Sequence, residues 1–159
     1  MTQPDFTTSI QVSQNPDAVF AAINNVRGWW SANIEGPTDV LNESFFYSFQ
    51  DVHRCQLQVT ELVPGKKVVW LVKSNYFKFT HDQAEWTGTG IIFNISATGG
   101  KTLLQFTHQG LEPALECYNI CSNAWTEYIG QSLYSLITTG RGKPNSKEFD
   151  PTKEGVVTG

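Results

Sequence analysis

The stretch that decides the fold is PALECYNICSNAWTEYIGQSLYSLITTG, residues 113–140. Its apolar side chains recur every three to four positions, which is the spacing of one face of an α-helix. This face consists of Tyr118, Cys121, Trp125, Ile129, Leu133 and Leu136. The pattern ends at Gly140, and glycine commonly terminates helices. The sequence therefore predicts one long helix over residues 113–140, with Trp125, Ile129 and Leu136 buried against another layer.

Most of the chain before this helix alternates between apolar and polar side chains, which is the period of a half-buried β-strand. Six such runs are predicted to be strands: residues 6–12, 45–49, 53–59, 68–72, 87–95 and 102–108. The pairs Pro64-Gly65 and Gly99-Gly100 are turn sequences that would join their flanking strands as hairpins. The predicted sheet is thus antiparallel, and the strand parity directs Trp70 to its inner face.

A short amphipathic helix is predicted directly after the first strand. Asn15 is a good N-cap, Pro16 suits the first helical position, and apolar residues then follow at helical spacing until Gly28. Residues 33–42 and 74–85 have no regular pattern and are predicted to be irregular. Strands, a short helix and a long C-terminal helix form an α+β arrangement, in which a curved sheet wraps around the final helix.

The chain has 159 residues, a length that suits a single domain with one core. We predict that residues 1–140 form this domain and that residues 141–159 form a polar C-terminal tail. The net charge of −4 disfavours binding to nucleic acids or to an anionic membrane surface. No apolar run approaches the roughly 20 residues of a membrane span, and the N-terminus does not have the layout of a signal peptide. We therefore expect a cytoplasmic protein, and its three cysteines are expected to be reduced.

Four segments, which together cover most of residues 6–144, resemble a known family. They are FTTSIQVSQNPDAVFAAINNVRGWW, TELVPGKKVVWLV, EWTGTGIIFNIS and FTHQGLEPALECYNICSNAWTEYIGQSLYSLITTGRGKP. They are similar to a bacterial branch of the homologues of the heat-shock protein 90 ATPase activator, within the START-like, or SRPBCC, superfamily. This resemblance implies a helix-grip fold with a cavity between the sheet and the long helix.

The inward parity of the strands indicates which side chains would line such a cavity. Bulky rings with a few polar tips suit a flat or amphipathic organic molecule. The predicted ligand-binding set is Trp30, Tyr47, His53, Trp70, Phe93, Phe106, His108, Tyr118 and Trp125. The alternative is that the rings only pack the core, and that His53 and His108 are buried histidines hydrogen-bonded to Tyr118, Glu116 or backbone.

The sequence favours no metal, cofactor or catalytic site. The nearest set of metal-ligating types is His108, Cys117, Cys121 and Cys55, but it contains no C-x-x-C pair. There is no G-x-S-x-G elbow and no glycine-rich phosphate loop, and the glycines of TGTG at residues 87–90 suit sheet curvature instead. We therefore expect no bound cofactor.

Three functions are compatible with these features. The expected one is a non-catalytic binding module for a hydrophobic or aromatic small molecule. The second is interaction with a heat-shock chaperone, which the resemblance implies, although the N-terminal module of the eukaryotic activators has no counterpart in this sequence. The third is an enzyme of the cyclase or hydrolase type that uses His53 or His108 as a general base. The sequence identifies neither the ligand nor the oligomeric state.

Overall fold

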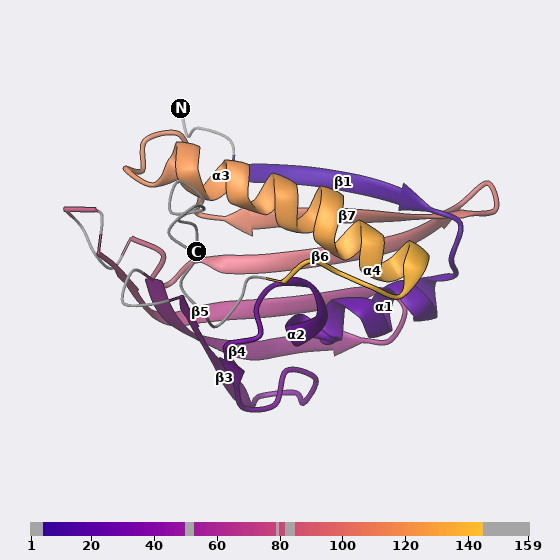
Figure 1. Ribbon diagram of the computed structural model, residues 1–159, viewed down its shortest axis with the longest axis horizontal. Coiled ribbons are helices and arrows are strands. Elements are labelled where there is room, and N and C mark those ends of the chain that lie inside the picture. The colour runs from indigo at the N-terminus through magenta and orange to yellow at the C-terminus, as the bar shows by residue number, and fades with distance from the viewer. Residues whose placement is uncertain (1–4, 50–52, 79, 82–84, 145–159) are drawn as a thin grey trace.

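The centre of the protein is a strongly curved antiparallel sheet (Figure 1). The computed structural model describes residues 5–49, 53–78, 80–81 and 85–144. Within them, seven strands lie in the order β1-β7-β6-β5-β4-β3-β2. Their bounds are β1 Phe6–Val12, β2 Ile34–Glu35, β3 Ser44–Phe49, β4 His53–Val63, β5 Lys67–Phe77, β6 Gly90–Thr98 and β7 Lys101–Gln109. The predicted antiparallel sheet is confirmed, and the short strand β2 adds to it an element that the sequence did not predict.

The C-terminal helix crosses one face of this sheet (Figure 1). It is continuous from Tyr118 to Thr139 but changes its winding, with α3 at Tyr118–Glu127, a π-helical segment at Tyr128–Leu133, and α4 at Tyr134–Thr139. Two shorter helices, α1 at Pro16–Asn24 and α2 at Val26–Trp29, follow β1. The predicted α+β helix-grip fold is confirmed.

The long helix begins later than the predicted start at Pro113. The carboxylate of Glu85 accepts hydrogen bonds from the backbone N–H groups of Glu116, at 2.8 Å, and Cys117, at 3.1 Å. These donors lie just before the first turn, where backbone N–H groups have no partner within a helix. The cap therefore comes from a distant part of the chain, and helical pattern alone could not place the boundary at Tyr118.

Three other boundaries also differ from the prediction. The first helix ends because Asn25 has a non-helical ψ of 65°, while Gly28 lies inside α2. Strand β5 continues to Phe77, because that residue pairs with His53 of β4. Strand β6 begins only at Gly90, because the residues before it form turns.

The core lies between the inner face of the sheet and the C-terminal helix, and it is dominated by aromatic rings. Trp125 and Ile129 are fully buried, as predicted, whereas Leu136 is partly buried and packs at the margin of the core. The largest fully buried side chains include Trp29, Trp30, Trp70, Trp86, Trp125, Tyr47, Phe45, Phe77, Phe93 and Phe106. Such rings supply most of the apolar contact in a domain of this size.

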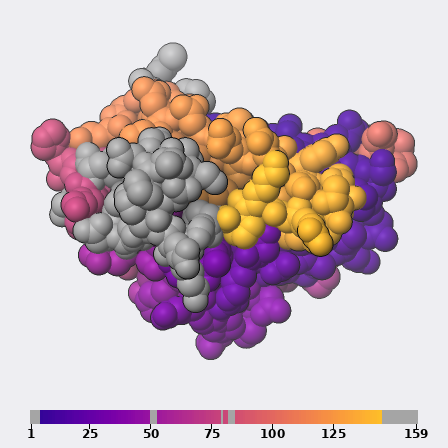
Figure 2. Space-filling view, in the orientation of Figure 1, coloured from indigo at the N-terminus to yellow at the C-terminus, as the bar shows by residue number. Residues whose placement is uncertain are grey.

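The segment after α4 folds back onto α2. The hydroxyl of Ser132, in the π-helical segment, donates to the carbonyl of Trp29 at 2.6 Å and accepts from the backbone N–H of Lys143 at 2.7 Å. A side chain at Gly142 would collide with the carbonyl oxygen of Gly28. In Figure 2 the yellow atoms of this region lie directly against the purple atoms of the N-terminal part. The rest of the predicted tail, residues 145–159, lies outside the described residues.

None of the helices in the described part of the chain is long and apolar enough to cross a bilayer.

Candidate functional site

The predicted ligand-binding residues come together in the core. Eight of the nine have at most 1% of their surface exposed: Trp30, Tyr47, His53, Trp70, Phe93, Phe106, His108 and Trp125. Ring contacts join them into one cluster, hereafter the aromatic cluster. Trp30 stacks on Tyr47 with 4.3 Å between ring centroids, and Phe106 lies 4.7 Å from Trp125. The ninth, Tyr118, is partly buried and packs against the edge of the core.

The rings of the aromatic cluster fill the space between the sheet and the helix with one another. Trp30 and Trp70 are nearly parallel, at 7° and a centroid distance of 6.0 Å, and the edge of Phe93 packs on Trp70 at 4.9 Å. A ring that lined a water-sized cavity would keep accessible surface, and these three rings have none. Ligand binding by the cluster therefore stays a prediction, and it requires that at least one ring moves.

One end of the cluster, hereafter the His108 end, consists of His108, Trp125, Thr89 and Trp86. The indole N–H of Trp125 donates to Nδ1 of His108 at 3.0 Å. An indole can only donate, so the His108 proton is on Nε2, which donates to the Thr89 hydroxyl at 2.8 Å. That hydroxyl donates in turn to the carbonyl of Trp86 at 2.6 Å. Both ring nitrogens of His108 are thus bonded, by partners other than the Tyr118 or Glu116 considered from the sequence.

A second group, hereafter the His53 end, consists of His53 with Asn75 and of three rings linked to it in series: Tyr47 lies 5.1 Å from His53, Trp30 lies 4.3 Å from Tyr47, and Trp70 lies 6.0 Å from Trp30. The two groups touch, because Trp86 contacts both histidines and Trp30 lies 5.2 Å from Trp125. Nε2 of His53 lies 2.7 Å from the side-chain oxygen of Asn75, so this nitrogen carries the proton and donates. The opposite nitrogen, Nδ1, is buried and has no hydrogen-bond partner among the described residues. The His53 imidazole therefore presents an unused acceptor inside the core.

Two indole groups at the His53 end are also unpaired. Nε1 of Trp30 and Nε1 of Trp70 are buried without a partner in the described part of the chain, and the same is true of Nε1 of Trp86 at the His108 end. The neighbouring Trp29 provides a contrast, because its indole N–H donates to the carbonyl of Ile23 at 3.1 Å. A buried donor without a partner costs about 1–3 kcal/mol, so such groups are rare in folded proteins and call for a physical reason.

Burial keeps both histidines neutral. Loss of solvation lowers the pKa of His53 from 6.5 to about 3, although the hydrogen bond to Asn75 opposes this effect. Burial also lowers the pKa of His108 to about 3, and repulsion from His53 adds to the shift. A base with such a low pKa is poorly matched to proton abstraction near neutral pH. The low pKa of both histidines therefore does not favour the general-base role considered from the sequence.

The cysteines lie in the same core but are not poised for chemistry. All three are free and buried. Burial raises the pKa of the Cys55 and Cys121 thiols, which keeps them protonated and poorly suited to bind metal or act as nucleophiles. Among residues 5–49, 53–78, 80–81 and 85–144, no three metal-ligating side chains of the His, Cys, Asp or Glu types gather in one place.

Sequence reasoning missed three members of the two ends. Trp86 touches His53 at 4.8 Å, His108 at 4.6 Å and Trp125 at 5.8 Å between ring centroids. It follows a segment predicted to be irregular, so strand parity could not assign it to the inner face. Its signal in the sequence is the presence of a tryptophan beside a polar stretch. Asn75 was missed because it lies beyond the end of a predicted strand, whereas Thr89 lies within the predicted strand over residues 87–95 but was not included in the predicted site.

No protein-family model and no curated protein matches the chain. Solved structures share its fold. The Aha1 dimer from Colwellia psychrerythraea has a TM-score of 0.70 and 22% identity, over 87% of this chain and 99% of that one. Protein SSP2350 from Staphylococcus saprophyticus has a TM-score of 0.65 and 11% identity, over 91% of this chain and 100% of that one.

A third similar structure is DynU16, a protein of the dynemicin biosynthetic locus. It has a TM-score of 0.64 and 15% identity over 89% of this chain, which spans 51% of the length of DynU16. Identities this low show the fold alone. The predicted helix-grip fold is confirmed, and the similarity to an Aha1 structure agrees with the resemblance seen in the sequence.

Proposed function

We propose that the protein is a non-catalytic binding module for a flat, largely apolar molecule, which it holds between the sheet and the C-terminal helix at the His53 end. The observation that carries this proposal is the set of buried, unpaired polar atoms at that end: the indole nitrogens of Trp30 and Trp70 and Nδ1 of His53. Each loses its hydrogen bonds to water on folding and gains none from the protein. A bound molecule that supplied them would recover this cost.

The unpaired atoms indicate the chemistry of the ligand. Two are donors and one is an acceptor, so a planar ring system with a carbonyl oxygen suits them best, and a hydroxyl on the ligand could donate to His53. The stacked rings of Trp30, Tyr47 and Trp70 offer flat apolar faces for such a molecule. Because these rings have almost no exposed surface, binding is coupled to the movement of at least one of them.

His108 has a structural role in this proposal. Both of its ring nitrogens already have protein partners, so a ligand gains no hydrogen bond from it without breaking the Trp125 or Thr89 contact. The remaining rings of the predicted set, Phe93, Phe106 and Trp125, would form the apolar wall. Tyr118, at the start of α3, would lie at its rim.

A matched pair of probes tests the proposal. 1-Indanone and indane have the same flat bicyclic frame, but only indanone carries a carbonyl oxygen. In a site without unpaired donors, the carbonyl of indanone would lose its hydrogen bonds to water and gain none from the protein. Indanone would then bind more weakly than indane. We expect indanone to bind about 2–10 times more tightly, the value of one net hydrogen bond. The measurement is an equilibrium titration of each probe followed by tryptophan fluorescence, with native mass spectrometry to detect any molecule that co-purifies.

Variants locate the effect. Trp30→Phe and Trp70→Phe keep an aromatic ring but remove the unpaired donor, and each is expected to reduce the preference for indanone. Trp29→Phe is the matched control, because the Trp29 indole is already bonded. The proposal is wrong if indane binds as tightly as indanone to the unaltered protein, or if neither probe binds.

Interaction with a heat-shock chaperone is the second candidate function. It is supported by the similarity to the Aha1 dimer, which extends over 99% of that chain. Its test is a pull-down with the cognate chaperone, together with an ATPase assay. Stimulated ATP turnover is the expected result, and unchanged turnover at saturating protein would exclude the activator role. For either function a cytoplasmic location is proposed, supported by three buried cysteines that carry no disulfide.

A further inference from the structure

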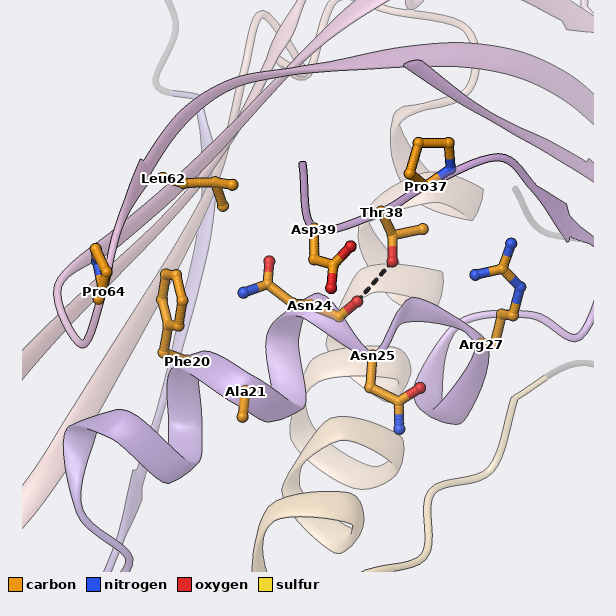
Figure 3. Close-up of a pocket in the computed structure, with 10 residues that line it drawn as sticks. All are labelled: Phe20, Ala21, Asn24, Asn25, Arg27, Pro37, Thr38, Asp39, Leu62 and Pro64. Atoms are coloured by element: carbon orange, nitrogen blue, oxygen red, sulfur yellow. Dashed lines mark hydrogen bonds between the residues drawn. The ribbon is translucent and has the colours of Figure 1, made fainter. Parts of the chain in front are cut away.

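A pocket of about 680 Å³ lies outside the aromatic cluster (Figure 3). It forms where α1, the start of α2, the residues after β2 and the turn between β4 and β5 meet. Its volume falls in the range of small-molecule sites. None of the residues that line it belongs to the predicted ligand-binding set, so it is independent of the function proposed above.

One end of this pocket is apolar. Phe20 of α1 and Leu62 of β4 are partly buried and pack against the core, and Pro64 of the β4–β5 turn lies beside them (Figure 3). Because Phe20 and Leu62 are fixed by the core behind them, they form a preformed surface for an apolar group.

The middle of the pocket presents hydrogen-bond acceptors. The side-chain oxygen of Asn24 is buried and has no partner among the described residues. The Thr38 hydroxyl donates to the backbone carbonyl of Asn24 at 2.7 Å, which ties the segment after β2 to the end of α1. Figure 3 shows the Asp39 carboxylate on the same side as the Asn24 side chain. A carboxylate and an unpaired amide oxygen together suit an ammonium group.

The far end of the pocket carries a cation. One guanidinium nitrogen of Arg27 donates to the carbonyl of Gly36 at 2.8 Å, which holds the side chain in place. A guanidinium has five N–H donors, so others are left for a ligand. In the described part of the chain no ion pair joins Arg27 to Asp39, and the pocket thus offers one separate charge of each sign.

We infer that this pocket binds a free amino acid with an apolar side chain. The three kinds of group that line the pocket, apolar, acceptor and cationic, match the three groups of such a ligand. The side chain would lie against Phe20 and Leu62, the ammonium group at Asp39 and Asn24, and the carboxylate at Arg27. A cationic ligand would be repelled by Arg27, and an anionic ligand would be repelled by Asp39. The two residues together therefore favour a zwitterion over a ligand with a single charge.

The test compares three probes that share a phenyl ring. L-Phenylalanine carries both charges, phenethylamine carries only the ammonium group, and 3-phenylpropionate carries only the carboxylate. We expect phenylalanine to bind, and each analogue to bind at least about tenfold more weakly, because each lacks one charge-assisted hydrogen bond. Glycine, without the apolar group, is also expected to bind weakly. Affinities and location are measured by amide chemical-shift changes in ¹H–¹⁵N spectra.

Two variants and a control complete the test. Asp39→Asn and Arg27→Gln are each expected to weaken phenylalanine binding about tenfold, whereas Glu127→Gln, on the exposed face of α3, is expected to leave it unchanged. Asp39→Asn should not alter the indanone titration, so this inference and the proposed function can fail separately. The inference is overturned if no probe shifts the pocket residues at the solubility limit of phenylalanine, or if a singly charged analogue binds as tightly as phenylalanine.

Discussion

The two histidines of the aromatic core are equally buried but differ in how their ring nitrogens are used. At the His108 end, the chain of bonds from Trp125 through His108 and Thr89 leaves both imidazole nitrogens paired. At the His53 end, one imidazole nitrogen and two indole N–H groups have no partner among the described residues, and the indole N–H of Trp86, which touches both histidines, has none either. Burial and low pKa are therefore shared by both histidines, and only the hydrogen bonds separate a structural histidine from a candidate ligand contact.

The largest expected effect comes from breaking the His108 end at its centre. Trp125→Ala removes a fully buried ring and leaves Nδ1 of His108 without its donor. We expect the free energy of unfolding to fall by about 3–5 kcal/mol, measured by chemical denaturation. Tyr134→Ala, an exposed position on the same helix, is the control and should cost little. If Trp125→Ala lowers the free energy of unfolding no more than the control does, the helix does not pack on the sheet through the face that carries Trp125.

Acid should destabilise the fold through both ends. In the unfolded chain each histidine takes up a proton near pH 6.5, whereas in the folded chain His53 and His108 do so only near pH 3. Stability is therefore fully present above pH 6.5 and is lost as the pH falls towards 3, by about 1.4 kcal/mol per pH unit for each histidine.

Single variants separate the contributions of the two histidines to this loss of stability in acid. His53→Leu and His108→Leu should each remove about half of the histidine contribution to the slope of unfolding free energy between pH 6.5 and pH 5. The measurement is a series of denaturation curves across that range. Slopes equal to that of the unaltered protein would show that the imidazoles are not buried as neutral groups.

At neutral pH the same two variants should differ in stability. His108→Leu leaves the buried Trp125 indole without an acceptor, so we expect a cost of about 1–3 kcal/mol. His53→Leu removes an unpaired buried nitrogen and leaves only the partly buried Asn75 without this donor, so we expect a cost below about 1 kcal/mol. The reverse order in thermal or chemical denaturation would contradict the assignment of paired and unpaired ends.

The smallest expected difference concerns two neighbouring tryptophans. Trp29→Phe and Trp30→Phe remove the same volume from the core, but only Trp29 loses a hydrogen bond, to Ile23. Trp29→Phe should therefore be the less stable variant by about 1 kcal/mol. Equal stabilities in parallel denaturation experiments would indicate that the Trp30 indole has a partner in solution.

Period and parity were enough to predict the architecture and the inward positions. The alternation around Trp70 and the helical spacing around Trp125 each depend on neighbours in sequence, and both were predicted correctly. The start of the long helix depends on a contact with Glu85, which lies 32 residues before Cys117 in the chain. Local patterns do not contain such contacts.

The division of the core into two ends could not be predicted either. Parity placed both His53 and His108 inside, but it carries no information about which nitrogen finds a partner. That depends on Trp86, which lies outside the predicted strands, on the hydroxyl of Thr89, and on the register that brings β5 beside β4. Hydrogen-bond pairing across a core is a property of the assembled fold, and it requires the three-dimensional structure.

The most direct test of the account is a ¹H–¹⁵N spectrum of the indole groups during titration with 1-indanone. The chain has five tryptophans, so five resonances can be assigned by single Trp→Phe variants. We expect the Trp30 and Trp70 signals to move towards the hydrogen-bonded range, while those of Trp29 and Trp125, which are already bonded, keep their hydrogen-bonded shifts. Equal chemical-shift changes at all five indole resonances, or no change at a saturating concentration of 1-indanone, would contradict the claim that the His53 end is the binding site.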